Sequence, residues 1–316
     1  MTRALCAQRL DSGHASRFTH HNESMSRPSV NMTGKVCVIT GSNAGIGKET
    51  ALGLARMHAT VVMVCRDGLR GSTAQHELKQ QSGNDSIELM ICDLASQNSI
   101  RRLASELKER HDRLDVLINN AGVLLREHSL NEDGIENTFA INHLGYFLLT
   151  NSLLEVLKKS TPSRIVNVAS TAHKYGKLDI GAWVTGADYS AFNAYANSKL
   201  ANVLFTYELA RRLEGTNVTA NCLHPGAVGT NLFRGLPGFL EALIKLVTLR
   251  PERGARTSIY LASSPDVEGV TGMYFAKRKE QRSSPESHDH NAARRLWEVS
   301  EELTGTLESR LNTRRS

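Results

Sequence analysis

The segment VCVIT, residues 36–40, runs directly into GSNAGIG, residues 41–47, and this junction decides the fold. A β-branched apolar run is typical of a buried strand, and the amphipathic stretch over 46–57 that follows is typical of a helix. Glycines between a strand and a helix let the backbone approach a pyrophosphate, which the free amides and dipole of the helix N-terminus then hold. The spacing is not G-x-G-x-x-G, so glycines that only shape a turn remain the alternative. The residues expected at this phosphate site are Gly41, Ser42, Asn43, Gly45, Ile46 and Gly47.

From Lys35 onward, short β-branched runs alternate with longer amphipathic stretches, which is the pattern of βαβ units around a parallel sheet. The predicted strands are Val36–Thr40, Thr60–Val64, Ile87–Cys92, Val116–Asn119, Arg164–Ala169, Val218–Leu223 and Gly272–Phe275. The predicted helices are Ile46–Met57, Arg70–Gln80, Gln97–Arg110, Gly134–Lys158, Ala194–Leu213, Glu252–Ala262 and a peripheral helix over 288–304. We therefore predict an α/β fold, a single Rossmann-type doubly wound parallel sheet of about seven strands flanked by helices.

The two ends of the chain differ from its body in composition. Residues 1–31 are rich in Ser, His, Arg and Asn without periodicity, which predicts a disordered leader, with Met25 and Met32 as alternative starts. Residues 32–280 are expected to form one nucleotide-binding domain, and residues 281–316 a C-terminal extension that carries the peripheral helix.

Composition excludes several classes of function. Of the net charge of +6, residues 1–34 and 277–316 each carry +2, so the body is nearly neutral. No basic stripe is interleaved with aromatic residues, and we expect no nucleic-acid partner. No window approaches the ~18 consecutive apolar residues of a membrane span, and the first residues lack the apolar centre of a signal peptide. A cytoplasmic protein is the expectation.

Cysteine and histidine usage gives no metal or disulfide pattern. The five cysteines form no C-x-x-C pair and the 12 histidines no His-x-x-x-His pair, so we predict reduced thiols and no metal site. The cysteines are Cys6, Cys37, Cys65, Cys92 and Cys222. Trp183 and Trp297 are interpreted as packing residues.

The end of the second predicted strand indicates which cofactor binds. In a nucleotide-binding fold, the residue that recognises the ribose lies about twenty residues after the glycines. Here the chain reads Val64-Cys65-Arg66-Asp67, and the planar charged fork of Arg66 suits a 2′-phosphate, which favours NADP(H). A solvated loop arginine is the alternative, and Asp67 keeps NAD(H) open. Asp93, after the third strand, is expected at the adenine edge or as an ordinary helix N-cap.

Tyr195 and Lys199 lie four residues apart at the start of a predicted helix and therefore share a face. An ammonium beside a phenol favours the phenolate, so we expect the pKa of Tyr195 to be lowered toward use as an acid at neutral pH. By themselves the two residues would more often be a helical surface pair. Asn119-Asn120-Ala121-Gly122 and Ser170, however, also follow predicted strands, and open α/β sheets bind ligands at the carboxyl ends of their strands.

With this combination the chain resembles the short-chain dehydrogenase/reductase family over about residues 33–276. The matching positions are Thr40-Gly41 to Gly47, Asn119–Gly122, Asn142, Ser170, Tyr195, Lys199 and Pro225-Gly226. The resemblance implies that Tyr195 exchanges a proton with the substrate oxygen, which Ser170 holds. It also implies that Lys199 lowers the tyrosine pKa and bonds the nicotinamide ribose, and that Asn142 anchors a water of the proton relay.

The resemblance also assigns the rest of a cofactor site. Gly41, Gly45 and Gly47 would cradle the pyrophosphate. Asn119 and Gly122, with Asn120 and Ala121 between them, would line the adenosine side, and Pro225, Gly226 and Thr230 would flank the nicotinamide.

The sequences of residues 193–202 and of His224-Pro225-Gly226 are similar to those of the retinol dehydrogenase-like branch. This resemblance implies a small lipophilic aldehyde, ketone or alcohol as substrate. Helices near 134–158 and 194–213 resemble the family's dimer faces.

Residues 235–249 carry a broad apolar face after Gly235-Leu236-Pro237-Gly238, which predicts a lid over the substrate or a peripheral membrane contact. A helix packed permanently on the sheet edge is the alternative for this segment. For the whole chain, the alternative to an NADP-dependent oxidoreductase is an NADP(H)-binding sensor or scaffold without turnover.

Overall fold

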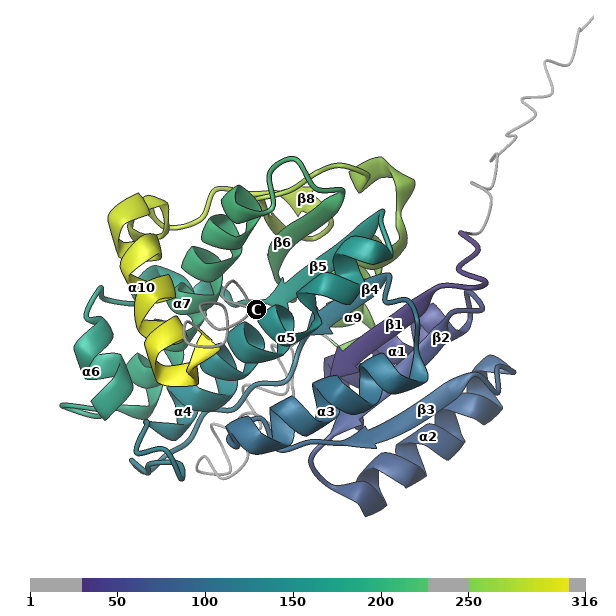
Figure 1. The fold of residues 1–316 in the computed structure, drawn as a ribbon, viewed down its shortest axis with the longest axis horizontal. Helices are drawn as coiled ribbons and strands as arrows, with labels where there is room; N and C mark the ends of the chain where they lie inside the picture. Colours follow the sequence, from purple (N-terminus) through teal and green to yellow (C-terminus); the bar gives the residue numbers. More distant parts are fainter. Residues whose placement is uncertain (1–29, 227–249, 307–316) are drawn as a thin grey trace, which may run out of the picture.

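The part of the chain that the computed structural model describes, residues 30–226 and 250–306, is built around one sheet of eight strands. The strands are β1 (Val36–Thr40), β2 (Thr60–Cys65), β3 (Ile87–Ile91), β4 (Val116–Asn119), β5 (Ser163–Val168), β6 (Val218–His224), β7 (Tyr274–Ala276) and β8 (Lys279–Glu280). Their order is β3-β2-β1-β4-β5-β6-β7-β8 (Figure 1), and all neighbours are parallel except β7 and β8. Strands of a covered parallel sheet are near-continuous apolar runs, and VCVIT of β1 is buried at every position.

Helices cover both faces of this sheet. They are α1 (Gly45–Ala55), α2 (Gly68–Ser82), α3 (Gln97–Arg110), α4 (Asn137–Phe139), α5 (Gly145–Lys159), α6 (Ile180–Thr185), α7 (Ala191–Arg212), α9 (Pro251–Ser263) and α10 (His290–Thr304). One core cluster joins the sheet to α1, α2 and α9, and includes Leu54, Leu78 and Leu261. A second joins it to α3, α5 and α7, and includes Leu103 and Leu149. The doubly wound fold predicted from the sequence is confirmed.

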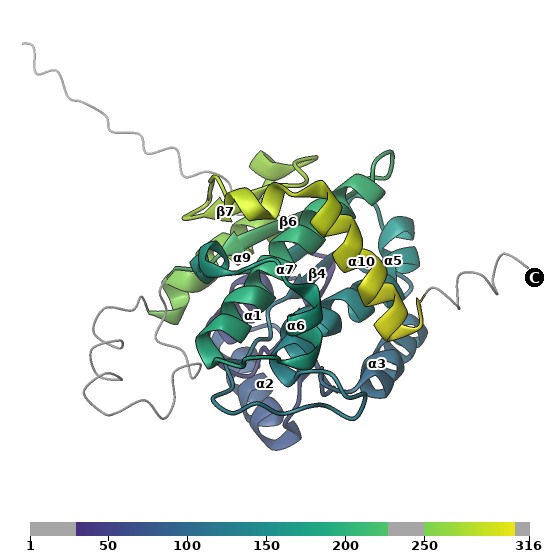
Figure 2. The ribbon, with the colours of Figure 1, turned by 90° about the vertical axis from the view of Figure 1, so that its left-hand side faces the viewer.

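Helix α10 lies beside α7 and α5 (Figure 2), and an aromatic cluster joins the three helices. Trp297 of α10 stacks on Phe205 of α7 with 5.8 Å between ring centroids, and meets Phe147 of α5 edge-on at 4.9 Å. Such pairs contribute about 0.5–1.5 kcal/mol each beyond the area they bury. The helix expected over 288–304 is therefore present and packed through its apolar side, with Trp297 as a core residue.

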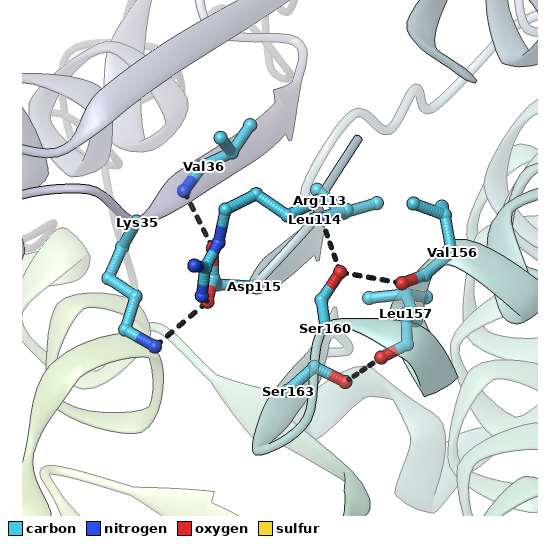
Figure 3. A network of polar contacts seen from close by, with 9 residues as sticks. All are labelled: Lys35, Val36, Arg113, Leu114, Asp115, Val156, Leu157, Ser160 and Ser163. Carbon is cyan, nitrogen blue, oxygen red and sulfur yellow. Dashed lines mark hydrogen bonds and ion pairs between the residues drawn. The ribbon is translucent and has the colours of Figure 1, made fainter. Parts of the chain in front are cut away.

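Asp115 joins two segments, residues 35–36 and 113–115, at the amino-terminal ends of the central strands (Figure 3). Its carboxylate accepts hydrogen bonds from the Val36 amide and Lys35 Nζ, both at 2.9 Å, and from the Arg113 guanidinium at 2.9 and 2.5 Å. The aspartate is only 3% exposed. Burial by itself raises the pKa of Asp115, but the bonds from Arg113 and Lys35 outweigh it and lower the pKa overall. The start of β1 is thereby fixed against β4.

Two serines form hydrogen bonds to backbone groups at the same end of the sheet (Figure 3). Ser160 Oγ accepts from the Leu114 amide at 2.8 Å and donates to the Val156 carbonyl at 2.6 Å. Ser163 Oγ donates to the Leu157 carbonyl at 2.8 Å. These bonds satisfy two carbonyls at the end of α5 and one amide just before β4.

The predicted single helix over 134–158 is wrong at its start, because residues 134–136 lie outside the helical segment, which begins at Asn137. Gly134 has φ +75°, a left-handed conformation that ends any helix, and the Glu136 carboxylate accepts from the Thr138 and Phe139 amides at 2.7 and 2.8 Å. The chain then passes through one π-helical turn, Ala140–Leu144, before α5 begins. Glu136 is therefore the N-cap from which this helical segment starts.

Five short elements of the described residues were not expected from the sequence, two of them the 3-10 turns Pro265–Val267 and Pro285–His288. The two-residue strand β8 is too short to show a period. The 3-10 turn Thr171–Tyr175 and helix α6 lie between β5 and α7. The predicted leader, except for residues 30–31, and the predicted lid over 235–249 lie outside the described residues.

Within the described residues, the helices are all too short or too polar for a bilayer span.

Candidate functional site

A cavity of about 820 Å³ opens at the carboxyl ends of the parallel strands. Its walls come from the turns after β1, β2, β3 and β4, from the end of β5, from β6 and from the start of α7. Part of its lining consists of Gly41, Gly47, Arg66, Asp93, Asn120, Gly122, Ser170, Tyr195, Lys199, Pro225 and Gly226. Residues predicted separately along the chain are thus gathered around one space, at the edge where open α/β sheets bind ligands.

The glycine turn after β1 needs its glycines for close approach. Gly41 has φ +67°, and a Cβ on Gly47 would stand 2.3 Å from the Gly41 carbonyl oxygen and 2.4 Å from Asn120 Nδ2. The N-cap residue of α1 is Ala44, which makes no side-chain hydrogen bond to the helix. Within the described residues, the first amides of α1 therefore lie at the cavity without a capping side chain. Gly41, Asn43, Gly45, Ile46 and Gly47, which were predicted to hold a phosphate, line the cavity. Ser42 does not, because its hydroxyl turns inward to the Ile39 carbonyl at 3.0 Å.

Two arginines line the cavity after β2. Arg66 is exposed there, and so is Arg70 in the first turn of α2, which the sequence analysis did not single out. Asp67 lines the cavity too, and its carboxylate also caps α2 by accepting from the Arg70 amide at 3.0 Å. This end of the cavity therefore carries two arginines and one capping carboxylate. Asp93 lines it as well, and its carboxylate accepts from the Ala95 amide at 3.0 Å.

Of the two asparagines that end β4, only one faces the cavity. Asn119 was expected to line it, and that prediction is wrong: the side chain is fully buried and donates to Thr150 Oγ1 at 3.0 Å and Asn167 Oδ1 at 2.9 Å. Asn120 lines the cavity and donates to the Thr40 carbonyl at 2.8 Å. Asn119 thus ties β4 to α5 and β5, whereas Asn120 shapes the glycine turn.

Ser170 and Tyr195 meet in the inner part of the cavity. Ser170 follows β5 and caps the 3-10 turn, its Oγ accepting from the Ala172 amide at 3.2 Å. Tyr195 lies in the first turns of α7. The sequence predicted a lowered pKa for this tyrosine, but burial raises the pKa of Tyr195 to about 12, with Ser170 acting in the opposite direction. A phenol with this pKa keeps its proton at neutral pH and can donate it.

Lys199 places a nearly buried amine next to that phenol. It is 3% exposed, and its Nζ donates to the Val168 carbonyl at 3.0 Å. The nitrogen lies 5.6 Å from the centre of the Tyr195 ring and 5.8 Å from that of Tyr146, whose hydroxyl donates to the Ala121 carbonyl at 2.6 Å. Burial lowers the pKa of Lys199 to about 7. Tyr146 was missed by the sequence analysis, since a tyrosine inside an apolar helix carries no distinguishing signal.

Asn142 sits in the π-helical turn behind this group. Its Oδ1 accepts from the Val123 amide at 2.8 Å, and its Nδ2 donates to the Val123 carbonyl at 2.9 Å and to Ser198 Oγ at 3.0 Å. The side chain therefore fixes the loop that carries Gly122 against α7. π-Helical turns are frequent at functional sites.

The carboxyl end of β6 completes the described part of the cavity. His224, Pro225 and Gly226 line it, and His224 Nδ1 accepts from the Thr171 amide at 3.2 Å. Burial lowers the pKa of His224 to about 4, so this ring is neutral. Thr230, predicted to flank the nicotinamide, lies outside the described residues.

Comparison with known proteins decides the family. The model of the short chain dehydrogenases matches residues 35–237. The chain belongs to the short-chain dehydrogenase family. It is 48% identical to mouse retinol dehydrogenase 14 over 87% of both chains, and 44% identical to human retinol dehydrogenase 13 over 86% of this chain and 85% of the relative. The resemblance to the family and to its retinol dehydrogenase-like branch is thereby confirmed, which places this chain among oxidoreductases of alcohols and carbonyls.

Solved structures of other proteins share the fold. An uncharacterized protein from Mycobacterium Paratuberculosis aligns with a TM-score of 0.71 and 33% identity, over 88% of this chain and 96% of that one. The RhlG/NADP active-site complex of Pseudomonas aeruginosa aligns with a TM-score of 0.64 and 28% identity, over 79% of this chain and 96% of that one.

The outer part of the cavity of this short-chain dehydrogenase is apolar. Tyr175 and Phe192 are exposed, line the cavity and contact one another with 5.8 Å between ring centroids. Val123, Leu124 and Ile141 line it too. Large exposed aromatic side chains beside a cavity are typical of a site for an apolar ligand. Across residues 30–226 and 250–306, no three His, Cys, Asp or Glu side chains gather as metal ligands would.

Proposed function

We propose that this protein is an NADP(H)-dependent oxidoreductase that interconverts a lipophilic aldehyde or ketone, in the class of retinal, and its alcohol. The observation that carries the proposal is that Ser170, Tyr195 and Lys199 line one cavity whose outer wall is apolar. The relatives named retinol dehydrogenases support the same substrate class.

Each of the inner residues has a role that its surroundings support. Tyr195, protonated at neutral pH, would donate its proton to the oxygen of a carbonyl under reduction, while the Ser170 hydroxyl holds that oxygen. Lys199 in its protonated form would offset the negative charge of the Tyr195 phenolate. Its amine lies beside the ring and titrates near neutral pH. Asn142, which is bonded to Val123 and Ser198, would anchor a water that extends the proton relay.

The residues around the glycine turn fit a dinucleotide. A Cβ on Gly47 would fill the space beside the turn, and the uncapped amides of α1 suit a pyrophosphate. Arg66 and Arg70 would bind a 2′-phosphate, and an NADP complex is described for the similar Pseudomonas aeruginosa protein. The nicotinamide would supply or accept the hydride.

The alternative is an NADP(H)-binding sensor or scaffold without turnover. Such a protein needs the glycine turn, the arginines and Lys199 as a cofactor ligand, but neither the Tyr195 proton donor nor the Ser170 hydroxyl. Tyr195 and Ser170 both line the cavity, and a protein that only binds the cofactor gains little from having them there. Measured turnover separates the two functions.

The test is NADPH consumption with retinal and with straight-chain aldehydes of increasing length. We expect kcat/KM to rise with chain length, since each buried methylene contributes about 0.8 kcal/mol. Phe192→Ser should flatten this rise, whereas Leu130→Ser, which alters an exposed leucine outside the cavity, should not. Binding of NADPH without turnover of any aldehyde or alcohol would leave the sensor function instead.

Cofactor choice is tested at Arg66. A charge-assisted hydrogen bond to phosphate contributes about 1.5–3 kcal/mol, so Arg66→Ala should weaken NADPH binding roughly tenfold or more and leave NADH nearly unchanged. Arg56→Ala, outside the cavity, is the matched control. If Arg66→Ala weakened the binding of NADPH and NADH equally, another residue would have to bind the 2′-phosphate.

A further inference from the structure

His173 lies three residues after Ser170, is fully buried and does not line the cavity. Its Nδ1 lies 2.6 Å from the Ser170 carbonyl oxygen, and its Nε2 lies 3.0 Å from the Ser284 backbone nitrogen. A carbonyl can only accept a hydrogen bond and a backbone N–H can only donate one. The two partners therefore fix a neutral ring with its proton on Nδ1 and a lone pair on Nε2.

Ser284 belongs to the segment between β8 and α10, and this segment is also fastened to α7. Ser283 Oγ lies 2.7 Å from the Tyr207 hydroxyl and 3.0 Å from His288 Nε2, and Ser287 Oγ donates to it at 2.7 Å. Tyr207 lies on the helix that carries Tyr195 and Lys199. Residues 283–288 thus contact both the turn that follows Ser170 and helix α7.

The turn after Ser170 has few other side-chain anchors. The Ser170 carbonyl also accepts from the His173 amide at 3.1 Å, and the Thr171 amide donates to His224 Nδ1 at 3.2 Å. Because the Ser170 hydroxyl caps this same turn, its direction depends on how the turn is held. His173 is the side chain that connects the turn to residues 283–288.

We propose that His173 is a positioning residue, which holds Ser170 by linking its carbonyl to the Ser284 amide through the neutral Nδ1–H ring. The catalytic part of this inference rests on the proposed function. A protonated ring would place a second N–H against the Ser284 N–H, so the link breaks on protonation. The groups that face the ring are Lys174 of the same turn, His224 of β6, the Tyr274 ring at 4.9 Å on β7, and Glu286. Burial lowers the pKa of His173, which keeps the ring neutral at physiological pH.

Two substitutions separate the two bonds. His173→Asn keeps a donor near the position of Nδ1 but cannot reach Ser284, whereas the longer side chain of His173→Gln can still accept from the Ser284 amide. In hydrogen exchange of the full chain, we expect the Ser284 amide to be protected in the native protein and in His173→Gln, and to lose protection in His173→Asn. His290→Asn, an exposed histidine at the start of α10, is the control and should match the native protein. Unchanged protection in His173→Asn would overturn the link.

Kinetics then test the positioning of Ser170. Both variants should lower kcat for aldehyde reduction by about tenfold or more, because small displacements of reacting groups are costly, while the Kd of NADPH changes less than about twofold. His173→Gln cannot titrate, so its rate relative to the native protein should rise as the pH falls. A native kcat in either variant, or a fall in kcat matched by lost NADPH binding, would overturn the positioning role. Absence of turnover in the native protein would instead refute the proposed function, and the exchange experiment would still decide the link.

Discussion

The two ends of the central strands handle buried charge in opposite ways. At the amino-terminal end, Asp115 is surrounded by a lysine, an arginine and a backbone amide, and its pKa falls despite burial. At the carboxyl end, Lys199 is equally buried, but its amine contacts a carbonyl oxygen and the faces of two tyrosine rings. Burial lowers its pKa, which favours the neutral amine. A compensated charge stabilises the fold. Among the described residues no carboxylate is in hydrogen-bond contact with the Lys199 amine. Burying an amine in this way is costly, which supports our proposal that the chemistry takes place at this end.

The largest effect expected from this contrast is on turnover at the carboxyl end. Tyr195→Phe keeps the packing of the ring but removes the proton donor, and general acid catalysis is typically worth about 10²–10⁴-fold. We expect kcat to fall by that factor in the NADPH-coupled aldehyde assay, with cofactor binding preserved.

Tyr260→Phe is the matched control for this substitution. It removes a phenol in α9 that does not line the cavity, and kcat should stay at the native value. A loss of only a few-fold in Tyr195→Phe would show that another group supplies the proton.

At the amino-terminal end, the expected effect is on stability. Asp115→Ala removes the acceptor of the Val36 amide, and Lys35 and Arg113 can turn to solvent, so the main cost is one buried unpaired N–H of about 1–3 kcal/mol. Urea unfolding should show a lower free energy of unfolding, and kcat per folded molecule should be unchanged. The neighbouring exposed Asp112→Ala should change the free energy of unfolding by no more than about 0.5 kcal/mol. A fall in kcat of the folded protein would mean that the two ends are coupled.

The sequence was a good guide wherever one local pattern decides the structure. The strand bounds Val36–Thr40 and Val116–Asn119 and the helix Gln97–Arg110 agree with the structure, because apolar runs and an amphipathic repeat with a serine cap determine them. The start of the helical segment near 134 was wrong. The left-handed conformation of Gly134 and the cap by Glu136 depend on the fold around them.

The site followed the same rule. Residue types and strand ends were enough to gather Ser170, Tyr195 and Lys199 around one cavity. Which of Asn119 and Asn120 points into it depends on the pleat of β4, and the rise in the pKa of Tyr195 depends on burial by distant segments. His173 has no pattern at all, because its partner Ser284 lies more than a hundred residues away in the chain.

The smallest expected effect sharpens the contrast through pH. Burial lowers the pKa of Lys199 from 10.5 to about 7, so between these pH values the unfolded chain holds a proton that the folded protein has lost. Where the unfolded state binds more protons, stability rises with pH.

Lys199→Met removes the free-energy cost of burying the Lys199 amine. It should raise the free energy of unfolding by about 1–2 kcal/mol at pH 7, as removal of a strained functional group does elsewhere, and the gain should shrink toward zero above pH 10.5. The measurement is urea unfolding of both proteins without added cofactor across that range. The exposed Lys159→Met, on the surface of α5, should show no such trend. Destabilisation by Lys199→Met at pH 7 would mean that the bond to the Val168 carbonyl outweighs the cost of burying the amine, and the contrast between the two ends would fail.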